Sequence, residues 1–526
     1  MSFRDTLIVS ILCAASVGCA DDSGDPSTNP YACTPARSGA YADGTSYLGV
    51  HADPGNSDRV PCSLAARFKQ GWHGLKGHGL AQPNTFSPDG ETTYATTAQK
   101  EEGGCSVFAL DVATGEERWC LSLPGAIASA VEVDVDGNLY VTGLTHIVSL
   151  DAAGDTRWRT DSPDGTGLVG LHFTPDGHIA SVTNDGIAVL IARADGAVLS
   201  TLDIPATWGL VPAPTFEAGG FDLKSLMPPE VVADIESLNG TDGGFGVGAF
   251  AGGGAFSDNT VGIAPNGDIY IVGGGLDEDH GALVQLKVSG TADAPELSAG
   301  WRLDLNKSSA SSPAISPDGA YLKVLDGNSL AGFLDPASTE ANARVVDLAA
   351  CEANTDADPD PEVCREAYVI PLRTGPALGA SPMLSGGLHY LWEVQVTSLA
   401  SHVGPDLIAY DRDQVLWELE LPDGKEWTSV ITVTDEHLVG TMTKVIASDT
   451  EVLGIPLPAT AQSELVLVNR RDGSIAFSAP ITDDATSTVT VGPDGALYVT
   501  MLSLVTSLAL ETRSVGGLMK FDPVVP

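Results

Sequence analysis

A four-residue turn motif recurs along the whole chain, and each copy precedes an alternating apolar stretch. Its Asp-Gly and Asn-Gly pairs supply the positive φ angles that a tight β-hairpin needs. The copies are SPDG 87–90, DVDG 134–137, TPDG 174–177, APNG 264–267, SPDG 316–319 and GPDG 492–495, with LSGG 384–387 and TDEH 434–437 as degenerate members. Such repetition predicts stacked copies of one supersecondary unit.

A second motif follows each turn and reads as a later strand of the same unit. The copies are FALDVATGEERW 108–119, IVSLDAAGDTRW 147–158, AVLIARADGAVL 188–199, LVQLKVSG 283–290, SLAGFLDP 329–336, LIAYDRDQVLW 407–417, LVLVNRRDGSIAF 465–477 and GGLMKFDP 516–523. The unit is therefore four antiparallel strands. It predicts an all-β chain folded as a single β-propeller of eight four-stranded blades. Seven blades stay open as the alternative, because two turns are degenerate.

Aromatic residues end most of the fourth strands, namely Trp119, Trp158, Trp301, Trp417 and, more loosely, Phe477. Their recurrence at one place in the repeat predicts packing between blades rather than contact with a substrate. The last copy lacks a fourth strand, whereas residues 66–77 carry Trp72 ahead of the first turn. We therefore expect a propeller over residues 66–526, closed by an N-terminal strand that completes the C-terminal blade and removes an open sheet edge.

These repeats resemble those of the pyrroloquinoline-quinone-type (PQQ-like) β-propeller family, and residues 108–119 match its pattern best. The family includes quinone-dependent alcohol dehydrogenases and exported lipoproteins that bind partners without a cofactor. The dehydrogenases have adjacent cysteines over the quinone, a calcium ion and a catalytic Asp. No two cysteines are adjacent here and no Cys-x-x-Cys-His haem motif occurs. The resemblance therefore implies the fold and the lipoprotein branch, without a redox cofactor.

The N-terminal residues read as a targeting segment. An apolar run at 6–17 follows Arg4, is too short for a permanent membrane span and suits a signal peptide over residues 1–18. Small residues before Cys19 resemble a bacterial lipoprotein cleavage box, so Cys19 is the expected lipidation site. Cleavage after Ala20 and plain secretion is the alternative. Residues 19–65 are expected to form a flexible tether and a cysteine-containing lead-in of an outer-membrane lipoprotein, facing the periplasm or the cell surface.

Six further cysteines remain after the leader. An even number in an exported protein predicts disulfides, although six cysteines allow 15 connectivities. Nearest-neighbour pairing joins Cys33 to Cys62, Cys105 to Cys120 and Cys351 to Cys364. The second pair has independent support, because it flanks the hairpin predicted around Thr114-Gly115.

Two insertions interrupt the repeat spacing, at 201–258 and 337–366. The first contains PPEVVADIESL, a helix candidate with proline at its start. The second contains Asp356, Asp358 and Asp360, whose alternating carboxylates resemble the start of a calcium loop. A solvated loop pinned by the cysteine pair at 351 and 364 is the competing interpretation, since Gly and Glu are missing from the later positions of such a loop.

Composition narrows the choice of function. Lys and Arg number 26 and Asp and Glu 69, for a net charge of −43, which disfavours nucleic acids and anionic lipids as ligands. His73 and His78 lack a third ligand at metal-site spacing and read as packing residues. We expect a monomeric binding or scaffolding module for a protein or polysaccharide, in contact with the membrane only through its lipid. The alternative is a hydrolase or lyase acting at the axial funnel.

Overall fold

The structure is a computed structural model. It describes residues 29–37, 39–42, 45, 47–212, 227–239, 256–257, 260–277, 280–306, 309, 311–326, 341–355, 364, 367–372, 389–390, 398–403, 406–411, 414–452 and 455–525. Within these ranges no helix has the length and apolar character needed to cross a membrane.

The described strands form eight antiparallel sheets, and seven of these have four strands. The first three contain β2 Thr85–Phe86, β3 Thr92–Thr96, β4 Val107–Asp111 and β5 Glu117–Leu121; β6 Glu132–Val133, β7 Leu139–Thr142, β8 His146–Leu150 and β9 Thr156–Asp161; and β10 Leu168–Phe173, β11 Ile179–Thr183, β12 Ile187–Ile191 and β13 Val198–Asp203. The next three contain β14 Gly262–Ile263, β15 Ile269–Gly274, β16 Gly281–Thr291 and β17 Ala294–Leu305; β18 Ala314–Ile315, β19 Tyr321–Asp326, β20 Ala341–Asp347 and β21 Tyr368–Leu372; and β22 His389–Tyr390, β23 Ser398–Val403, β24 Asp406–Asp411 and β25 Gln414–Glu420.

The last two sheets depart from this simple order. One contains five strands, β26 Lys425–Trp427, β27 Thr432–Val433, β28 His437–Val452, β29 Ile455–Asn469 and β30 Ile475–Ile481. The other contains β31 Val489–Val491, β32 Leu497–Met501 and β33 Gly517–Pro523, with β1 Phe68–Gly74 as its fourth strand. The pairing of β1 with β33 is antiparallel and joins Phe68 to Pro523 and Gly74 to Leu518.

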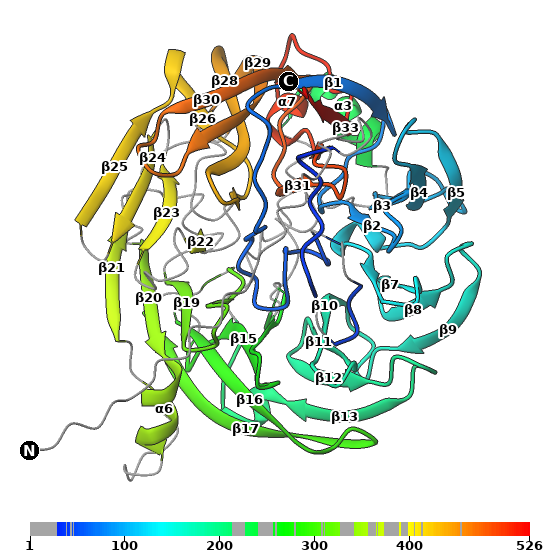
Figure 1. Cartoon of the computed structure of the whole chain (residues 1–526), viewed down its shortest axis with the longest axis vertical. Helices are drawn as coiled ribbons and strands as arrows, with labels where there is room; N and C mark the ends of the chain where they lie inside the picture. The colour runs from blue at the N-terminus through cyan, green and yellow to red at the C-terminus, as the bar shows by residue number, and fades with distance from the viewer. Residues whose placement is uncertain are drawn as a thin grey trace, which may run out of the picture.

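Figure 1 shows the sheets following one another around a ring in chain order, with the C-terminus beside β1. The prediction of an all-β, single β-propeller is confirmed, with seven four-stranded blades. The turns predicted at 87–90, 134–137 and 174–177 join the first and second strands of their sheets. Gly90, Gly137 and the equivalent glycines have φ between 68° and 94°, which explains why the motif ends in glycine.

Apolar side chains from neighbouring sheets meet in separate clusters around the ring. One such cluster combines Tyr94 and Val107 of the first sheet with Val133 and Leu139 of the second. Alternating strand residues thus bury one face against each neighbouring blade.

The recurrent tryptophans lie at these seams, as the repeat predicts. The indole Nε1 of Trp119 donates to the carbonyl of Ala152 in the next sheet, and Trp158 donates in the same way to Arg193. Trp417 does so to Arg470. The indoles therefore hold one blade to the next.

Trp301 departs from this pattern. It is fully buried, and no acceptor lies within hydrogen-bonding distance of its Nε1 among the described residues. The next sheet carries helix α6 Leu348–Thr355 where the other blades have a short turn, and Trp301 packs in one cluster with Leu348 and Cys351. The helix packs on the indole. It does not provide the backbone carbonyl that the turn of the next blade provides to Trp119, Trp158 and Trp417.

The helix predicted in the first insertion is present as α3 Pro229–Asn239. The other described helices are short: α1 Ile204–Trp208, α7 Leu504–Ser507 and the 3₁₀ turns η1 Ala126–Ala128 and η4 Pro422–Gly424.

Two expectations differ from the structure. The third strand of the fifth sheet is β20 at 341–347 and not the motif at 329–336, which lies outside the described residues. The range expected for the second insertion, 337–366, includes β20. The inserted helix α6 in fact follows β20 directly and leads toward β21, because the extra residues lengthen the connection between the third and fourth strands of the sheet.

Candidate functional site at the ring axis

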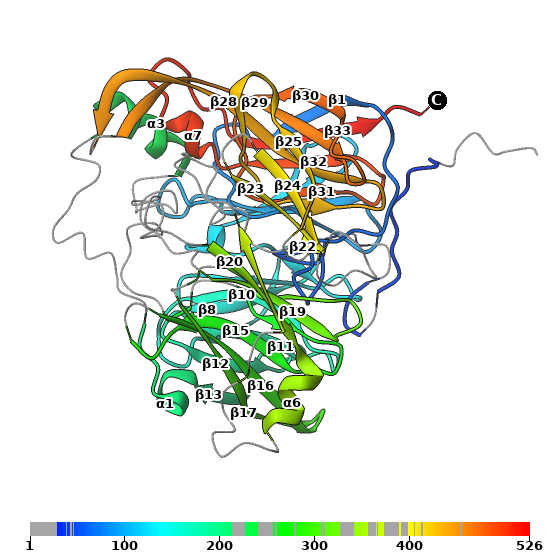
Figure 2. The ribbon, with the colours of Figure 1, turned by 90° about the vertical axis from the view of Figure 1, so that its left-hand side faces the viewer.

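The segment from residue 29 to residue 65, here called the axial segment, lies across the middle of the ring on one side (Figures 1 and 2). It bonds to the innermost strands of several sheets. The amides of Ile263 and Ile315 donate to the carbonyls of Pro54 and Gly55, and the amide of Val60 donates to Val433. The first strands of three different blades therefore hold this one segment.

This arrangement corrects the prediction of a flexible tether for the described part of residues 19–65. Tyr47, Asn56 and Asp58 are almost completely buried, although the segment is polar and rich in turn formers. Its polar groups find partners on the blades, which offsets the cost of burying them. The disulfide between Cys33 and Cys62 joins the two ends of the segment.

Two histidines, His51 and His172, lie at the centre of the contact between the axial segment and the blades. His51 Nδ1 lies 2.9 Å from Oδ2 of Asp58, and His51 Nε2 lies 2.9 Å from Oγ of Ser312, which precedes β18. Burial lowers the pKa of His51, but the carboxylate of Asp58 outweighs this effect, so the pKa ends above its usual value.

His172 on β10 makes a second network. Its Nδ1 lies 3.0 Å from Oε1 of Glu132 on β6, and its Nε2 lies 3.0 Å from Oδ1 of Asn56. The hydroxyl of Tyr41 also donates to Glu132, at 2.8 Å. Desolvation raises the pKa of Glu132, against the opposing charge of His172.

The order Ser312, His51, Asp58 is the hydrogen-bonding order of a nucleophilic triad. In this structure the three side chains are 2%, 4% and 0% exposed. Two of them belong to the axial segment itself, and the third belongs to the blade beneath it. Their hydrogen bonds therefore fasten the segment to the ring, and a substrate would have to displace the residues that make up the triad.

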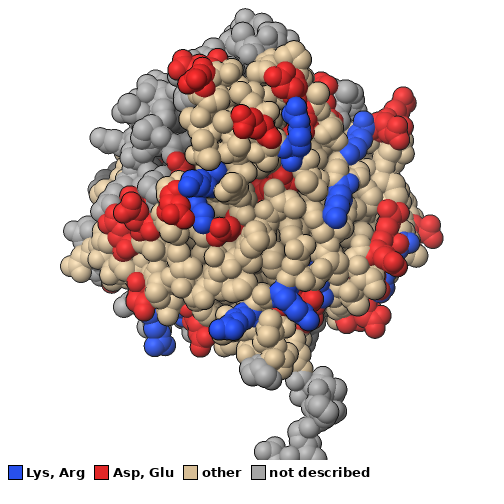
Figure 3. Space-filling view, turned by 90° about the horizontal axis from the view of Figure 1, so that it is seen from above, with Lys and Arg blue, Asp and Glu red and all other residues tan. Residues whose placement is uncertain are grey.

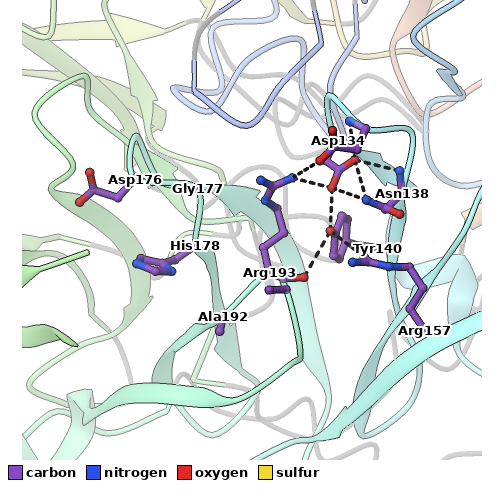
Figure 4. Close-up of a pocket in the computed structure, with 11 residues that line it drawn as sticks. Asp134, Asn138, Tyr140, Arg157, Asp176, Gly177, His178, Ala192 and Arg193 are labelled. Carbon is purple, nitrogen blue, oxygen red and sulfur yellow. Dashed lines mark hydrogen bonds and ion pairs between the residues drawn. The ribbon is translucent and has the colours of Figure 1, made fainter. Parts of the chain in front are cut away.

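A polar pocket of about 300 Å³ lies on the same side of the ring, between the second and third sheets (Figure 4). Asp134 is at its centre and accepts from Arg193 at 2.6 Å and from the hydroxyl of Tyr140 at 2.8 Å. Burial raises the pKa of Asp134, but bonds from Asn138 and Tyr140 and the charge of Arg193 bring it below its usual value. Burial beside Asp134 raises the pKa of Tyr140 to about 12.

Residues on the inner wall of this pocket hold the second and third sheets together. Arg193 bonds to Asp134 through its side chain and to Trp158 through its carbonyl. Asp136 and Asp176 line the pocket as exposed carboxylates, and Asp136 lies 3.8 Å from the guanidinium of Arg193. The pocket can accept a small polar or cationic group beside these carboxylates, whereas its buried aspartate is already neutralised.

The opposite side of the ring carries the connections between second and third strands, here called the loop face. Helix α3 reaches this face at the last sheet, where the side chain of Asp234 accepts from the amide and hydroxyl of Ser514. Val211, near the start of the same insertion, bonds to a different blade. Its amide donates to the carbonyl of Gly275, which follows β15 in the fourth sheet. The first insertion therefore connects distant blades on this face, and Figure 2 shows α3 and α7 on the side away from the axial segment.

Only some of the other predicted site residues belong to the part of the chain that the structure describes. Disulfides join Cys33 to Cys62, Cys105 to Cys120 and Cys351 to Cys364, as nearest-neighbour pairing predicts. Cys19 and the calcium candidates Asp356, Asp358 and Asp360 lie outside the described residues.

The histidines of β1 and the loop after it act as packing residues, as expected. His73 Nε2 lies 2.8 Å from the carbonyl oxygen of Gly516, and the ring of His78 packs edge-on against Phe108. Burial lowers the pKa of His78 to about 4. Within the described part of the chain, no group of three or more His, Cys, Asp or Glu side chains is arranged to hold a metal ion.

Sequence reasoning missed the axial networks. Their members come from residues 41–58, 132, 172 and 312, and no local spacing connects them. The two members that lie on strands, Glu132 and His172, carry one local signal, a polar residue where the strand pattern calls for an apolar one, as in LVGLHF.

Residues 70–209 match the model of a family described as outer membrane protein assembly factor BamB. No curated protein matches the chain. Among solved structures, BamB from Moraxella catarrhalis is 10% identical, with 86% of this chain and 99% of that chain covered and a TM-score of 0.45. Quinohemoprotein alcohol dehydrogenase from Comamonas testosteroni is 11% identical, with 90% and 80% covered and a TM-score of 0.53. The expected resemblance to PQQ-type β-propeller proteins is confirmed, and at these identities the structural likeness concerns the fold alone.

Proposed function

We propose that this chain is an exported, lipid-anchored binding or scaffolding module of the bacterial cell envelope, without a redox cofactor of its own. The observation that carries the proposal is the occupied ring axis. Propeller enzymes act at the axial funnel, and here the histidines and carboxylates that converge on one side of it bind the chain's own axial segment. The family match to an outer-membrane assembly factor supports a role in the envelope.

We also propose that the ring has eight blades and that β1 closes it. The five-stranded sheet supports the count of eight blades. Its strands β27, β28, β29 and β30 pair in chain order, as the four strands of the other blades do. The additional strand β26 pairs with residues 442–444 of β28. The pairing of β1 with β33 supports closure. Trp72 of β1 also makes the seam bond of the other tryptophans, donating to Val112 of the first sheet at 2.9 Å.

Export and anchoring at Cys19 complete the proposal. Three disulfides in the described chain are consistent with an oxidising compartment. Cleavage before Cys19 would leave the six paired cysteines and one thiol for the lipid.

The loop face is the proposed recognition surface. Leu144 and Leu276 lie between second and third strands and are 62% and 52% exposed, and Ile446 is exposed on the hairpin of β28 and β29. Exposed apolar side chains on connections held by rigid strands are typical of a binding surface. On the part of the edge seen in Figure 3, acidic and basic side chains are interspersed. The outer strands also carry exposed apolar residues, such as Val198 and Val415. We assign the protein or polysaccharide partner to the loop face because its exposed apolar residues lie on connections between strands.

A hydrolase remains the second candidate, because Ser312, His51 and Asp58 have triad connectivity. The two candidates differ in what Ser312 does. A scaffold needs it only to hold the axial segment, whereas a hydrolase needs it to attack a substrate.

Cross-linking in the native envelope tests the binding proposal. The full-length protein should be cross-linked in intact cells and purified, and the captured components compared with those of the Leu276→Asp variant. Val415→Asp is the matched control, since Val415 is also an exposed apolar residue but lies on the outer strand β25. We expect a component that Leu276→Asp loses and Val415→Asp keeps. Capture that is unaffected by Leu276→Asp, or lost equally in both variants, would contradict the assignment to the loop face.

A further inference from the structure

We propose that the side of the ring carrying the axial segment faces the lipid bilayer, so that the loop face points away from the membrane toward the partner. The inference rests on the proposed lipid at Cys19. It concerns how the protein is oriented, which the binding proposal leaves open.

The first described residues fix where the anchor reaches the ring. The side chain of Asn29 donates to the carbonyl of Asp494, and the amide of Cys33 donates to the carbonyl of Pro493 at 3.0 Å. Both acceptors belong to the turn between β31 and β32, the two inner strands of the last sheet. The chain therefore arrives near the axis, at the end of the ring opposite the loop face.

The tether between the lipid and the ring is short. Residues 20–28 separate Cys19 from Asn29. Even fully extended, the ten steps from Cys19 to Asn29 span at most about 35 Å.

The path to the loop face leads away from the point where the tether begins. β7 in the second sheet spans Leu139–Thr142, about 13 Å of strand, with a turn at each end. The tether would also have to pass from the inner strand to the rim, about 14 Å across four strands. Passing around the ring would therefore use most of the tether, whereas the axial side can face the bilayer with the tether unstretched.

Other features of the two faces agree with this orientation. The C-terminal end returns to the anchor side, where the amide of Val524 donates to Arg67. Leu144, Leu276 and Ile446 are exposed on the loop face, and Val135 is exposed in the turn between β6 and β7 on the axial side. Anchoring by the axial side leaves the three loop-face residues free to meet a partner.

Energy transfer to the bilayer tests the orientation. The full-length lipoprotein is purified from its envelope and placed in vesicles of phosphatidylethanolamine and phosphatidylglycerol that carry an acceptor dye on the headgroup. A donor dye is attached to Asp136→Cys or to Leu144→Cys. These exposed positions lie at opposite ends of one blade, and intact mass verifies that the three native disulfides stay closed.

We expect higher transfer efficiency from position 136 than from position 144. Equal transfer, or higher transfer from position 144, in protein that binds the vesicles would overturn the orientation and leave the lipid anchor standing. Failure of the wild-type protein to bind vesicles, with no difference from Cys19→Ser, would overturn both the anchor and the orientation. The two failures are therefore distinguishable.

Discussion

The indole nitrogen of Trp72 donates a hydrogen bond to the backbone carbonyl of Val112, at 2.9 Å. Trp72 belongs to β1 in the last sheet, and Val112 follows β4 in the first. The bond joins the last sheet to the first in the same way that Trp119 and Trp158 join neighbouring sheets. The seam between the last sheet and the first is therefore built like the others, as the proposed closure by β1 requires.

The seam between the last sheet and the first leaves no room for a side chain at Gly115. A Cβ there would lie 2.5 Å from Cδ2 of Trp72, whereas a Cβ at Gly165, which also has positive φ, would meet no atom within 4 Å. Gly165→Ala should cost about 1–2 kcal/mol from backbone strain alone. Gly115→Ala should cost about 1–3 kcal/mol more, because the indole must move. Urea unfolding of both variants measures the difference, and equal losses would mean that Trp72 does not pack at this seam.

Removal of residues 66–77 should prevent stable folding. The deletion takes away β1 and exposes the edge of β33, which would then be open to other chains. We expect aggregation or a loss of cooperative unfolding by circular dichroism and size-exclusion chromatography. A monomeric truncated protein with wild-type stability would refute closure by β1.

The buried carboxyl of Glu132 should make stability depend on pH. Burial raises the folded-state pKa of Glu132 above its ordinary value of 4.5. Its contribution to stability is therefore fully present below about pH 4.5 and is lost as the pH rises through the raised value. The raised pKa of His51 acts in the same direction.

Glu132→Gln should flatten this dependence, because glutamine does not titrate. The free energy of unfolding should be measured for both proteins from pH 4 to pH 8, with Glu117→Gln as an exposed control on β5. We expect the wild-type value to fall with rising pH more than that of Glu132→Gln. Parallel curves for the two proteins would show that the buried carboxyl is not protonated in the fold.

Ser312 should not react with a fluorophosphonate probe. It is 2% exposed, and its hydroxyl bonds to His51 of the axial segment. We expect no labelling of the wild-type protein by mass spectrometry, with a serine hydrolase as the positive control. Labelling that disappears in Ser312→Ala would favour the hydrolase alternative.

The repeat made much of the fold predictable, because each blade is specified locally. The Pro-Asp-Gly turns, the third strands and the seam tryptophans lie within about forty residues of one another and follow strand and turn chemistry. The pairing of Cys105 with Cys120 followed from the same hairpin. The position of β20 was harder to predict, because a weak motif at 329–336 resembled the third strand more than residues 341–347 did.

The axial segment could not be predicted in this way. Residues 20–45 have the composition of a tether, and nothing local indicates that Tyr41 or Tyr47 is buried. Their order depends on partners far along the chain, such as Glu132 for Tyr41 and Thr432 for Tyr47. Long-range pairing of polar groups outweighs local propensity here, so the candidate site emerged only from the assembled ring.

The central claim is that the chain's own axial segment occupies the ring axis, and amide hydrogen exchange on the full-length exported protein tests it most directly. The amide of Val60 bonds to Val433, and His51 and Asp58 are buried beside it. We predict that peptides covering residues 47–60 exchange as slowly as those from β7 and β15. Exchange of these peptides at the rate of an unstructured chain, with the blade strands still protected, would contradict the claim.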